Sequence, residues 1–145
     1  MSNNTPDYED NLAFEPAKAN GTLATIARDG KAVAIRCYID SQHYFDLGLE
    51  DAPKKMDWSA AKIWCEENYS RLPTAQELQF IGRNLKNINK MLKSAGGKEM
   101  KKGWYWSADE YSNKSAWLSR INLHGLIKYS LKINNLYVRA IMICD

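Results

Sequence analysis

The segment Arg71-Leu72-Pro73-Thr74-Ala75-Gln76-Glu77-Leu78 carries the clearest local signal in the chain. Thr74 with Glu77 three positions later predicts a capping box, in which each side chain accepts a hydrogen bond from the other residue's backbone. Pro73 disfavours helix in the residue before it, so the helix should begin just after it. Apolar residues at steps of three and four then predict an amphipathic helix of about five turns, ending near Gly96-Gly97. These residues are Leu78, Ile81, Leu85, Ile88 and Leu92.

A second helix is predicted upstream of this one. Asp57 is a good N-cap, and the helix should run from there to about Tyr69. Trp58, Ala61 and Cys65 fall at helical spacing on one face, so this face, and Cys65 with it, should be buried.

β-type sequence lies on both sides of the helices. Residues 22–27 and 32–40 are joined by Asp29-Gly30, a turn signal, and predict a hairpin. Residues 41–56, with Gly48 and Pro53, are interpreted as a connector. Four β-type runs follow the helices, with His124-Gly125 as a hairpin turn between the second and third; they are 104–107, 116–123, 126–131 and 137–143. The expected fold class is therefore α+β.

Length and composition indicate one globular domain. The chain has 145 residues, of which 45% are hydrophobic and 26% charged. We expect residues 1–20 to be a weakly ordered arm and residues 21–145 to form the domain. No apolar run approaches the ~20 residues that a membrane helix requires, so no membrane insertion is expected. Residues 1–20 lack the features of a signal peptide, so synthesis in the cytoplasm is expected.

The positive charge is unevenly distributed, although the net charge is only +3. Between residues 83 and 102 the single acid Glu99 stands among Arg83, Lys86, Lys90, Lys93, Lys98, Lys101 and Lys102. A solvated helix face and loop is the favoured interpretation. A nucleic-acid-binding stripe is the less favoured alternative.

The residues give little support for catalysis. His43 and His124 lie in no recognisable nucleophile arrangement, and Asp109-Glu110 is more simply a solvated turn than an acid/base pair. The six to eight oxygen ligands that calcium requires cannot be assembled from any local cluster. We therefore predict a non-enzymatic protein with no metal site, no cofactor and no calcium-dependent sugar binding.

An ordered set of motifs resembles a bacterial domain family of unknown function, DUF1566 or the Lcl C-terminal domain. The set covers roughly residues 57–143 and comprises Arg71-Leu72-Pro73-Thr74, Glu77-Leu78, Trp104-Tyr105-Trp106-Ser107, Ala116-Trp117, Gly125, Lys132 and Tyr137-Val138-Arg139-Ala140. The resemblance implies a C-type-lectin-like fold. It also implies a bond between Cys65 and Cys144, which match the first helix and last strand that such folds often bridge; the reducing compartment expected at synthesis argues against that bond.

The end of the chain is similar to the variable segments of proteins that diversity-generating retroelements rewrite in bacteria and their phages. In such segments a reverse transcriptase replaces adenines, and the types found at the matching positions can all be reached from an Asn codon. These positions imply a ligand-binding set of Leu118, Arg120, His124, Leu126, Tyr129, Ser130, Leu131, Ile133, Asn134, Asn135 and Leu136. Lys114 and Lys128 cannot be reached in this way and would have to be encoded by the template.

The physical character of these residues agrees with a recognition surface. Five of them are large aliphatic residues, and an apolar patch with a polar rim usually marks an interaction site. The alternative is that they are ordinary strands covering the core. Trp104, Trp106 and Trp117 are interpreted as core residues rather than a sugar-stacking set. Arg139 is interpreted as a buried structural cation, paired with an acid such as Glu77.

Three functional hypotheses follow from the sequence. The first is a diversified binding protein whose ligand is a protein or glycan on a cell or phage surface, which would associate it with a virion or cell surface. The second is a fixed adhesin or carbohydrate-binding module of a bacterial surface assembly. The third and least favoured is nucleic-acid binding through the basic stripe at residues 83–102.

Overall fold

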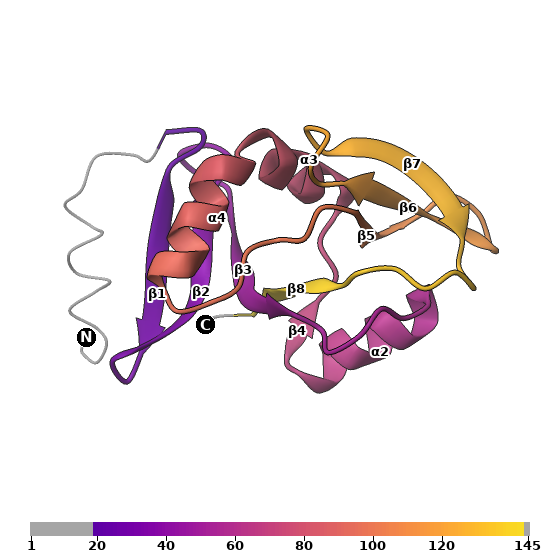
Figure 1. Ribbon diagram of the computed structural model, residues 1–145, viewed down its shortest axis with the longest axis horizontal. Helices are drawn as coiled ribbons and strands as arrows, with labels where there is room; N and C mark the ends of the chain where they lie inside the picture. The colour runs from indigo at the N-terminus through magenta and orange to yellow at the C-terminus, as the bar shows by residue number, and fades with distance from the viewer. Residues whose placement is uncertain (1–18, 144–145) are drawn as a thin grey trace.

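The computed structural model describes residues 19–143, which form an α+β fold as predicted. In this range the strands make two antiparallel sheets, one of five strands in the order β1-β2-β3-β8-β4 and one of three in the order β5-β6-β7. The three-stranded sheet lies beside the five-stranded one, with α3 between them (Figure 1). The elements are β1 Leu23–Arg28, β2 Lys31–Tyr38, β3 Tyr44–Asp51, α2 Trp58–Glu67, β4 Ser70–Arg71, α3 Ala75–Arg83, α4 Leu85–Ser94, β5 Trp104–Glu110, β6 Ser115–Arg120, β7 Leu126–Leu131 and β8 Arg139–Met142.

Both predicted hairpins are confirmed. Asp29 and Gly30, which join β1 to β2, have φ angles of 54° and 77°. His124 and Gly125, in the turn between β6 and β7, have φ angles of 54° and 73°. Positive φ at two successive residues matches the twist of the strands that a tight hairpin joins. The turn residues therefore predicted both connections correctly.

The prediction of a connector at residues 41–56 is wrong, because half of it is the strand β3. This strand pairs with β2 on one side and with β8 on the other. Its Asp46 is buried and accepts hydrogen bonds from Arg36 at 2.8 and 3.0 Å. Gly48 lies so close to β8 that an added Cβ would stand 3.1 Å from the carbonyl oxygen of Ala140. In the sequence, an acid and a glycine favour a loop. In the structure, Asp46 pairs with Arg36 of β2, and Gly48 allows the close approach of β8.

The helices follow the prediction except at one residue. Asp57 caps α2 by accepting a hydrogen bond from Ala60 N at 2.8 Å, and the capping box of Thr74 and Glu77 is present at the start of α3. The expected five-turn helix is broken at Asn84 into α3 and α4. The Asn84 side chain donates to the Phe80 carbonyl at 2.9 Å, a local bond that competes with the regular helix ladder.

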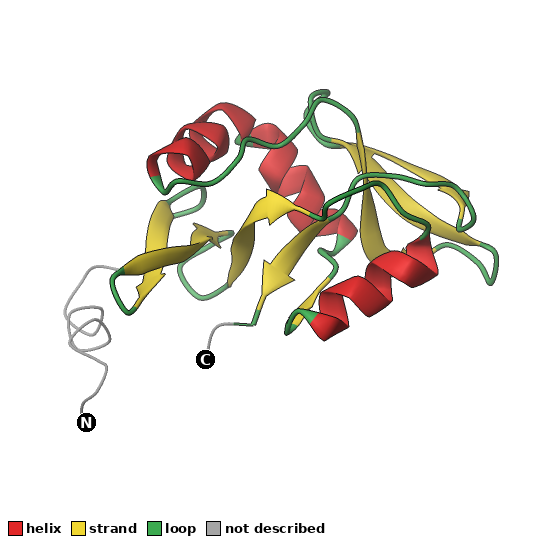
Figure 2. Ribbon diagram, turned by 60° about the horizontal axis from the view of Figure 1, so that its bottom comes forward, coloured by secondary structure: helices red, strands yellow, loops and turns green. Residues whose placement is uncertain are grey.

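The break redirects the chain. α4 lies over β1 and β2, while α3 lies against the three-stranded sheet (Figure 1). Figure 2 shows the helices spread around the sheets, with α2 apart from the other two.

Two hydrophobic clusters fill the interior. One joins the five-stranded sheet, α3 and α4 to one face of the three-stranded sheet through Tyr105 and Ile121. The other joins α2 to the opposite face through Trp106, Ala116 and Leu118. The three-stranded sheet is thus partly covered on both faces, which decides which of its side chains stay exposed.

A buried polar network ties the regions together. Arg139 is fully buried, as predicted, but its carboxylate partner is Asp51, at 2.7 Å, whereas Glu77 pairs with Arg71. Arg139 also donates to carbonyl groups of the β3 strand and of the loop after α4, and the Tyr105 hydroxyl donates to Asp51 at 2.9 Å. Burial and the Asp51 charge raise the pKa of Tyr105 far above its ordinary value, so the phenol stays protonated.

Two expectations from the sequence fall on residues outside the described range. The weakly ordered arm covers residues 1–18 in addition to Ala19 and Asn20, and the Cys65–Cys144 bond involves Cys144. Cys65 itself is fully buried in the cluster beneath α2, as the helical spacing predicted.

Candidate ligand-binding surface

Exposed apolar side chains are concentrated in the three-stranded sheet and its turns. Within residues 19–143, ten large hydrophobic side chains are exposed, and six of them lie between residues 111 and 133. These six are Tyr111, Leu123, Leu126, Tyr129, Leu131 and Ile133. Apolar surface is unfavourable in contact with water and is commonly covered by a binding partner. A concentration of this kind is therefore typical of an interaction site.

The strand register divides these side chains between two faces of the sheet. Residues directly opposite one another on antiparallel strands point to the same face, and neighbours along a strand alternate. Trp104 pairs with Arg120 and Arg120 with Leu126, whereas Trp117 pairs with Tyr129. We name the two groups the indole face, comprising Trp104, Arg120, Leu126 and Lys128, and the tyrosine face, comprising Tyr111, Trp117, Tyr129 and Leu131.

The indole face combines an aromatic ring with two cations. The guanidinium carbon of Arg120 lies 5.8 Å from the centre of the Trp104 ring, and the ammonium of Lys128 lies 5.9 Å from it. Both distances are within the range of cation–π attraction. Arg120 also donates weakly to Asn122 at 3.4 Å. Among residues 19–143, no carboxylate lies within 4.0 Å of either cation.

The tyrosine face is an exposed aromatic cluster. The rings of Tyr111 and Tyr129 are stacked with centroids 3.8 Å apart and planes 7° apart. Trp117 meets both edge-on, at 5.1 and 5.5 Å. A hydrogen bond with Tyr129 raises the pKa of Tyr111, so the Tyr111 hydroxyl is protonated at neutral pH. Each tyrosine is about half exposed, at 50% and 52%, so the cluster offers rigid aromatic area to a partner.

The structure places the predicted site residues in several locations rather than on one surface. Arg120 and Leu126 belong to the indole face, and Tyr129 and Leu131 to the tyrosine face. Ser130 is on the same side of the sheet as the indole face and accepts a hydrogen bond from Asn134. Ile133, Asn134 and Asn135 are exposed in the loop that follows β7.

The remaining three predicted residues belong to neither group of exposed side chains defined above. Leu118, expected to point outward, is buried in the cluster beneath α2, because that face of β6 is covered by Trp106 and Val138. Leu136 is half-buried against the same cluster and pairs with Met56. His124 is exposed, in a turn whose neighbour Gly125 touches α3.

The tryptophans also depart from the prediction that all three are core residues. Trp106 is fully buried and donates to the Met56 carbonyl at 3.0 Å. Trp104 and Trp117 are half-buried, each with part of its ring on one of the two faces defined above. Sequence alternation alone could not separate these cases, because it does not show which neighbours cover a strand.

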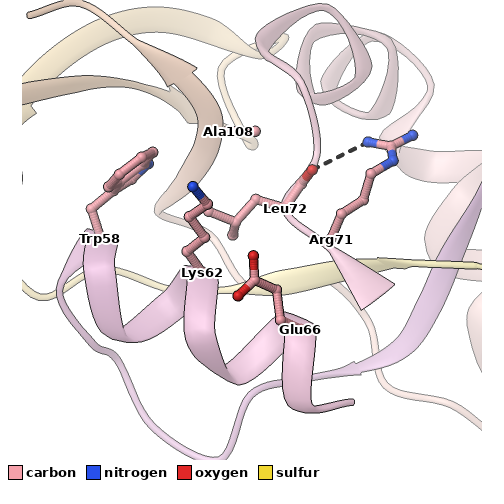
Figure 3. Close-up of a pocket in the computed structure, with 6 residues that line it drawn as sticks. All are labelled: Trp58, Lys62, Glu66, Arg71, Leu72 and Ala108. Carbon is pink, nitrogen blue, oxygen red and sulfur yellow. Dashed lines mark hydrogen bonds between the residues drawn. The ribbon is translucent and has the colours of Figure 1, made fainter. Parts of the chain in front are cut away.

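A small pocket opens beside the sheet, between α2, β4 and the end of β5. Its cavity is about 100 Å³ and is lined by Trp58, Lys62, Glu66, Arg71, Leu72 and Ala108. Figure 3 shows Lys62 and Glu66 rising from α2 at its rim, with the Arg71 guanidinium turned away to the Leu72 carbonyl. Trp58 is held by a hydrogen bond to the Ser107 carbonyl at 2.9 Å. The sequence gave no signal for this pocket, whose walls come from three separated segments.

The two acids considered for catalysis, and one of the two histidines, have structural partners. Asp109 accepts a hydrogen bond from the Ala75 amide at the start of α3, and Glu110 pairs with Lys132 at 2.6 Å. His43 pairs with Asp40 in an exposed turn. Within residues 19–143, no three His, Cys, Asp or Glu side chains lie close enough together to hold a metal ion.

The basic stripe follows α4 and the loop after it. Lys86, Lys90 and Lys93 are exposed on that helix, and Lys93 lies 3.9 Å from Glu99. In the described part of the chain, no helix is both long and apolar enough to cross a bilayer.

Comparison with protein-family models and with curated proteins found no match for this sequence.

Proposed function

We propose that the protein is a non-enzymatic binding protein that contacts its ligand through the β5–β7 sheet and its turns. The observation that carries the proposal is the concentration of exposed large hydrophobic side chains between residues 111 and 133. Tyrosine and tryptophan are enriched among residues that dominate binding energy, and the tyrosine face offers both.

The proposal extends to diversification of this surface by a retroelement, on a C-type-lectin-like scaffold of the DUF1566 type. Support comes from the residue types at the matching positions and from where many of them lie. Tyr129, Leu131, Ile133, Asn134 and Asn135 are exposed, so changing them would leave both hydrophobic clusters intact. Changes at Leu118 would instead disturb the interior, so we expect that position to stay apolar.

Sequencing of the gene's 3′ end across many cells of the source population tests diversification. We expect changes confined to adenine-derived codons between Ala116 and Tyr137, and a near-copy of the segment close by in the DNA. An invariant 3′ end with no such copy would reject diversification while leaving a binding role to be tested separately.

A selection experiment tests the binding role. The wild-type chain is used to select ligands from a displayed protein library, and each ligand is then measured against Tyr129→Ala and Ile63→Ala. Both residues are about half exposed, at 52% and 54%, but Ile63 is on α2, which packs against the face of the sheet opposite the tyrosine stack. We expect the Tyr129 change to weaken binding about tenfold or more and the Ile63 change to have little effect. Equal effects from both would contradict a site on this sheet.

A fixed carbohydrate-binding module is the second candidate, and the stacked pair of Tyr111 and Tyr129 on Trp117 is the observation that favours it. Sugar rings pack well on exposed aromatic faces. A glycan array distinguishes the candidates, since a fixed module should bind one sugar class and lose that binding in Tyr111→Ala.

A further inference from the structure

The indole face carries positive charge that no carboxylate of residues 19–143 pairs with. Arg120 and Lys128 come from neighbouring strands and approach the same indole ring at 5.8 and 5.9 Å. Elsewhere on the same sheet, Lys132 is neutralised by Glu110 at 2.6 Å. Within the described range 19–143, the two cations of the indole face have no carboxylate within 4.0 Å.

An aliphatic side chain lies beside these cations, and two more lysines are close to Trp104 in the sequence. Lys101 and Lys102 are exposed and come just before Trp104 in the chain. Leu126 is opposite Arg120 on the neighbouring strand and is 44% exposed. The surface therefore presents positive charge beside an apolar group, on one rigid sheet.

We infer that this face binds an acidic protein segment in which carboxylates alternate with apolar side chains. A carboxylate would meet Arg120 and Lys128, and an adjoining apolar side chain would cover Leu126 and the exposed part of Trp104. Arg and Trp are enriched in protein interfaces, and complementary charge sets the orientation of a partner. The inference rests on the proposed binding role of the β5–β7 sheet and adds the chemistry of the partner.

A single-stranded nucleic acid fits this face less well. Such ligands stack successive bases on several aromatic rings. The indole face exposes one ring, because Tyr105 and Tyr129 point to the other side of the sheet and Trp106, on the same side, is fully buried. A polyanion would also be drawn to the lysines of α4, which a segment docked on Trp104 would not contact.

Diversification would change this face in part. Trp104 precedes the Ala116–Tyr137 segment and would stay constant under the proposed function, while Arg120 and Leu126 change. The preference for an acidic partner would then be strongest in variants that keep Arg120.

Nuclear magnetic resonance titration of the full ¹⁵N-labelled chain tests the inference. The probe is a short peptide of alternating Glu-Leu-Gly units, and its twin has Gln in place of each Glu. We expect the acidic peptide to shift the Trp104 indole N–H and the amides of Arg120 and Lys128, with an affinity that falls as salt is raised. The Gln twin should shift none of these signals.

Charge-reversal variants supply the matched control. Lys128→Glu and Lys90→Glu change the net charge equally, and both lysines are exposed, but Lys90 is on α4. We expect Lys128→Glu to weaken binding of the acidic peptide about tenfold and Lys90→Glu to weaken it less than twofold. Equal weakening by both variants would show attraction to net charge alone and would overturn the inference.

Three other outcomes would also overturn it: equal shifts from the Gln twin, no shift at Trp104 with millimolar acidic peptide, and tighter binding of an oligothymidylate at the same signals. None of these bears on the selection experiment with Tyr129→Ala, which tests the binding role itself. The two proposals can therefore fail separately.

Discussion

The five-stranded sheet and the three-stranded sheet differ in which side chains they bury and which they leave exposed. The larger sheet buries two ion pairs, Arg36 with Asp46 and Arg139 with Asp51, each with a contact shorter than 3 Å. The smaller sheet buries no ion pair among the described residues and instead leaves Leu126, Tyr129 and Leu131 about half exposed.

This contrast separates structural from recognition roles. A buried charge that loses its partner is costly, so ion pairs in the larger sheet specify one arrangement of β2, β3 and β8. An exposed apolar side chain contributes little to folding and is available to a partner. The contrast predicts that substitutions in the larger sheet change stability, and that substitutions on the exposed faces of the smaller sheet change binding.

The largest expected effect is at Arg139. Arg139→Met removes the cation that pairs with the Asp51 carboxylate and the donor to the carbonyl groups of Gly48, Lys98 and Glu99, and should cost about 4 kcal/mol of unfolding free energy. Urea denaturation measures the loss. Lys90→Met, on an exposed face of α4, is the control. If Arg139→Met does not fold, Arg139→Lys should fold with a smaller loss, since it keeps the charge but not the full set of donors. A loss below about 1 kcal/mol would contradict the structural role.

A leucine pair tests which part of one face of the smaller sheet is covered, because Leu118 and Leu126 point to the same side. Leu118→Ala removes a side chain that is 4% exposed and should cost about 3 kcal/mol, because a cavity forms beneath α2. Leu126→Ala removes a side chain that is 44% exposed and should cost less than about 1 kcal/mol. Both are measured by denaturation, and similar losses would mean that the indole face is covered in solution.

The next largest expected effect on stability is at the contact between α3 and the β6–β7 turn. An added Cβ at Gly82 would stand 2.2 Å from the Gly125 nitrogen and 2.5 Å from its Cα, both backbone atoms. Gly82→Ala should therefore push the β6–β7 turn away from α3 and cost about 2 kcal/mol, although Ala is the better helix former. Asn87→Ala on α4 serves as the control, because its side chain is exposed. Stabilisation by Gly82→Ala would show that the turn does not pack as described.

The smallest effect concerns the ion pair at the end of the smaller sheet. The hydrogen bond and charge of Lys132 lower the pKa of Glu110 below its ordinary value of 4.5. A lowered pKa in the folded state means that the contribution to stability is present above pH 4.5 and is lost as the pH falls through the folded-state value. The stability difference between the wild type and Glu110→Gln should be small and should shrink on acidification from pH 6 to pH 3. Glu66→Gln, another exposed acid, provides the reference. A difference that grows on acidification would contradict the pairing.

Much of the local structure could be predicted because its causes are local. The capping box of Thr74 and Glu77 acts over three residues, and the turns at Asp29-Gly30 and His124-Gly125 act over two. The candidate site was predicted only in part. The residue types between 118 and 136 indicated exposed apolar groups correctly for Leu126, Tyr129 and Leu131, but not for Leu118.

The sequence by itself determined the α+β class, the helix starts and the tight turns, since backbone preferences and short-range hydrogen bonds decide them. Tertiary structure alone decided that β3 is a strand, and that Leu118 is buried while Leu126, on the same face of the sheet, is not. The physical reason is that alternation along a strand defines two faces without showing which part of a face is covered. Coverage of β6 depends on α2, Trp106 and Val138, which come from distant parts of the chain.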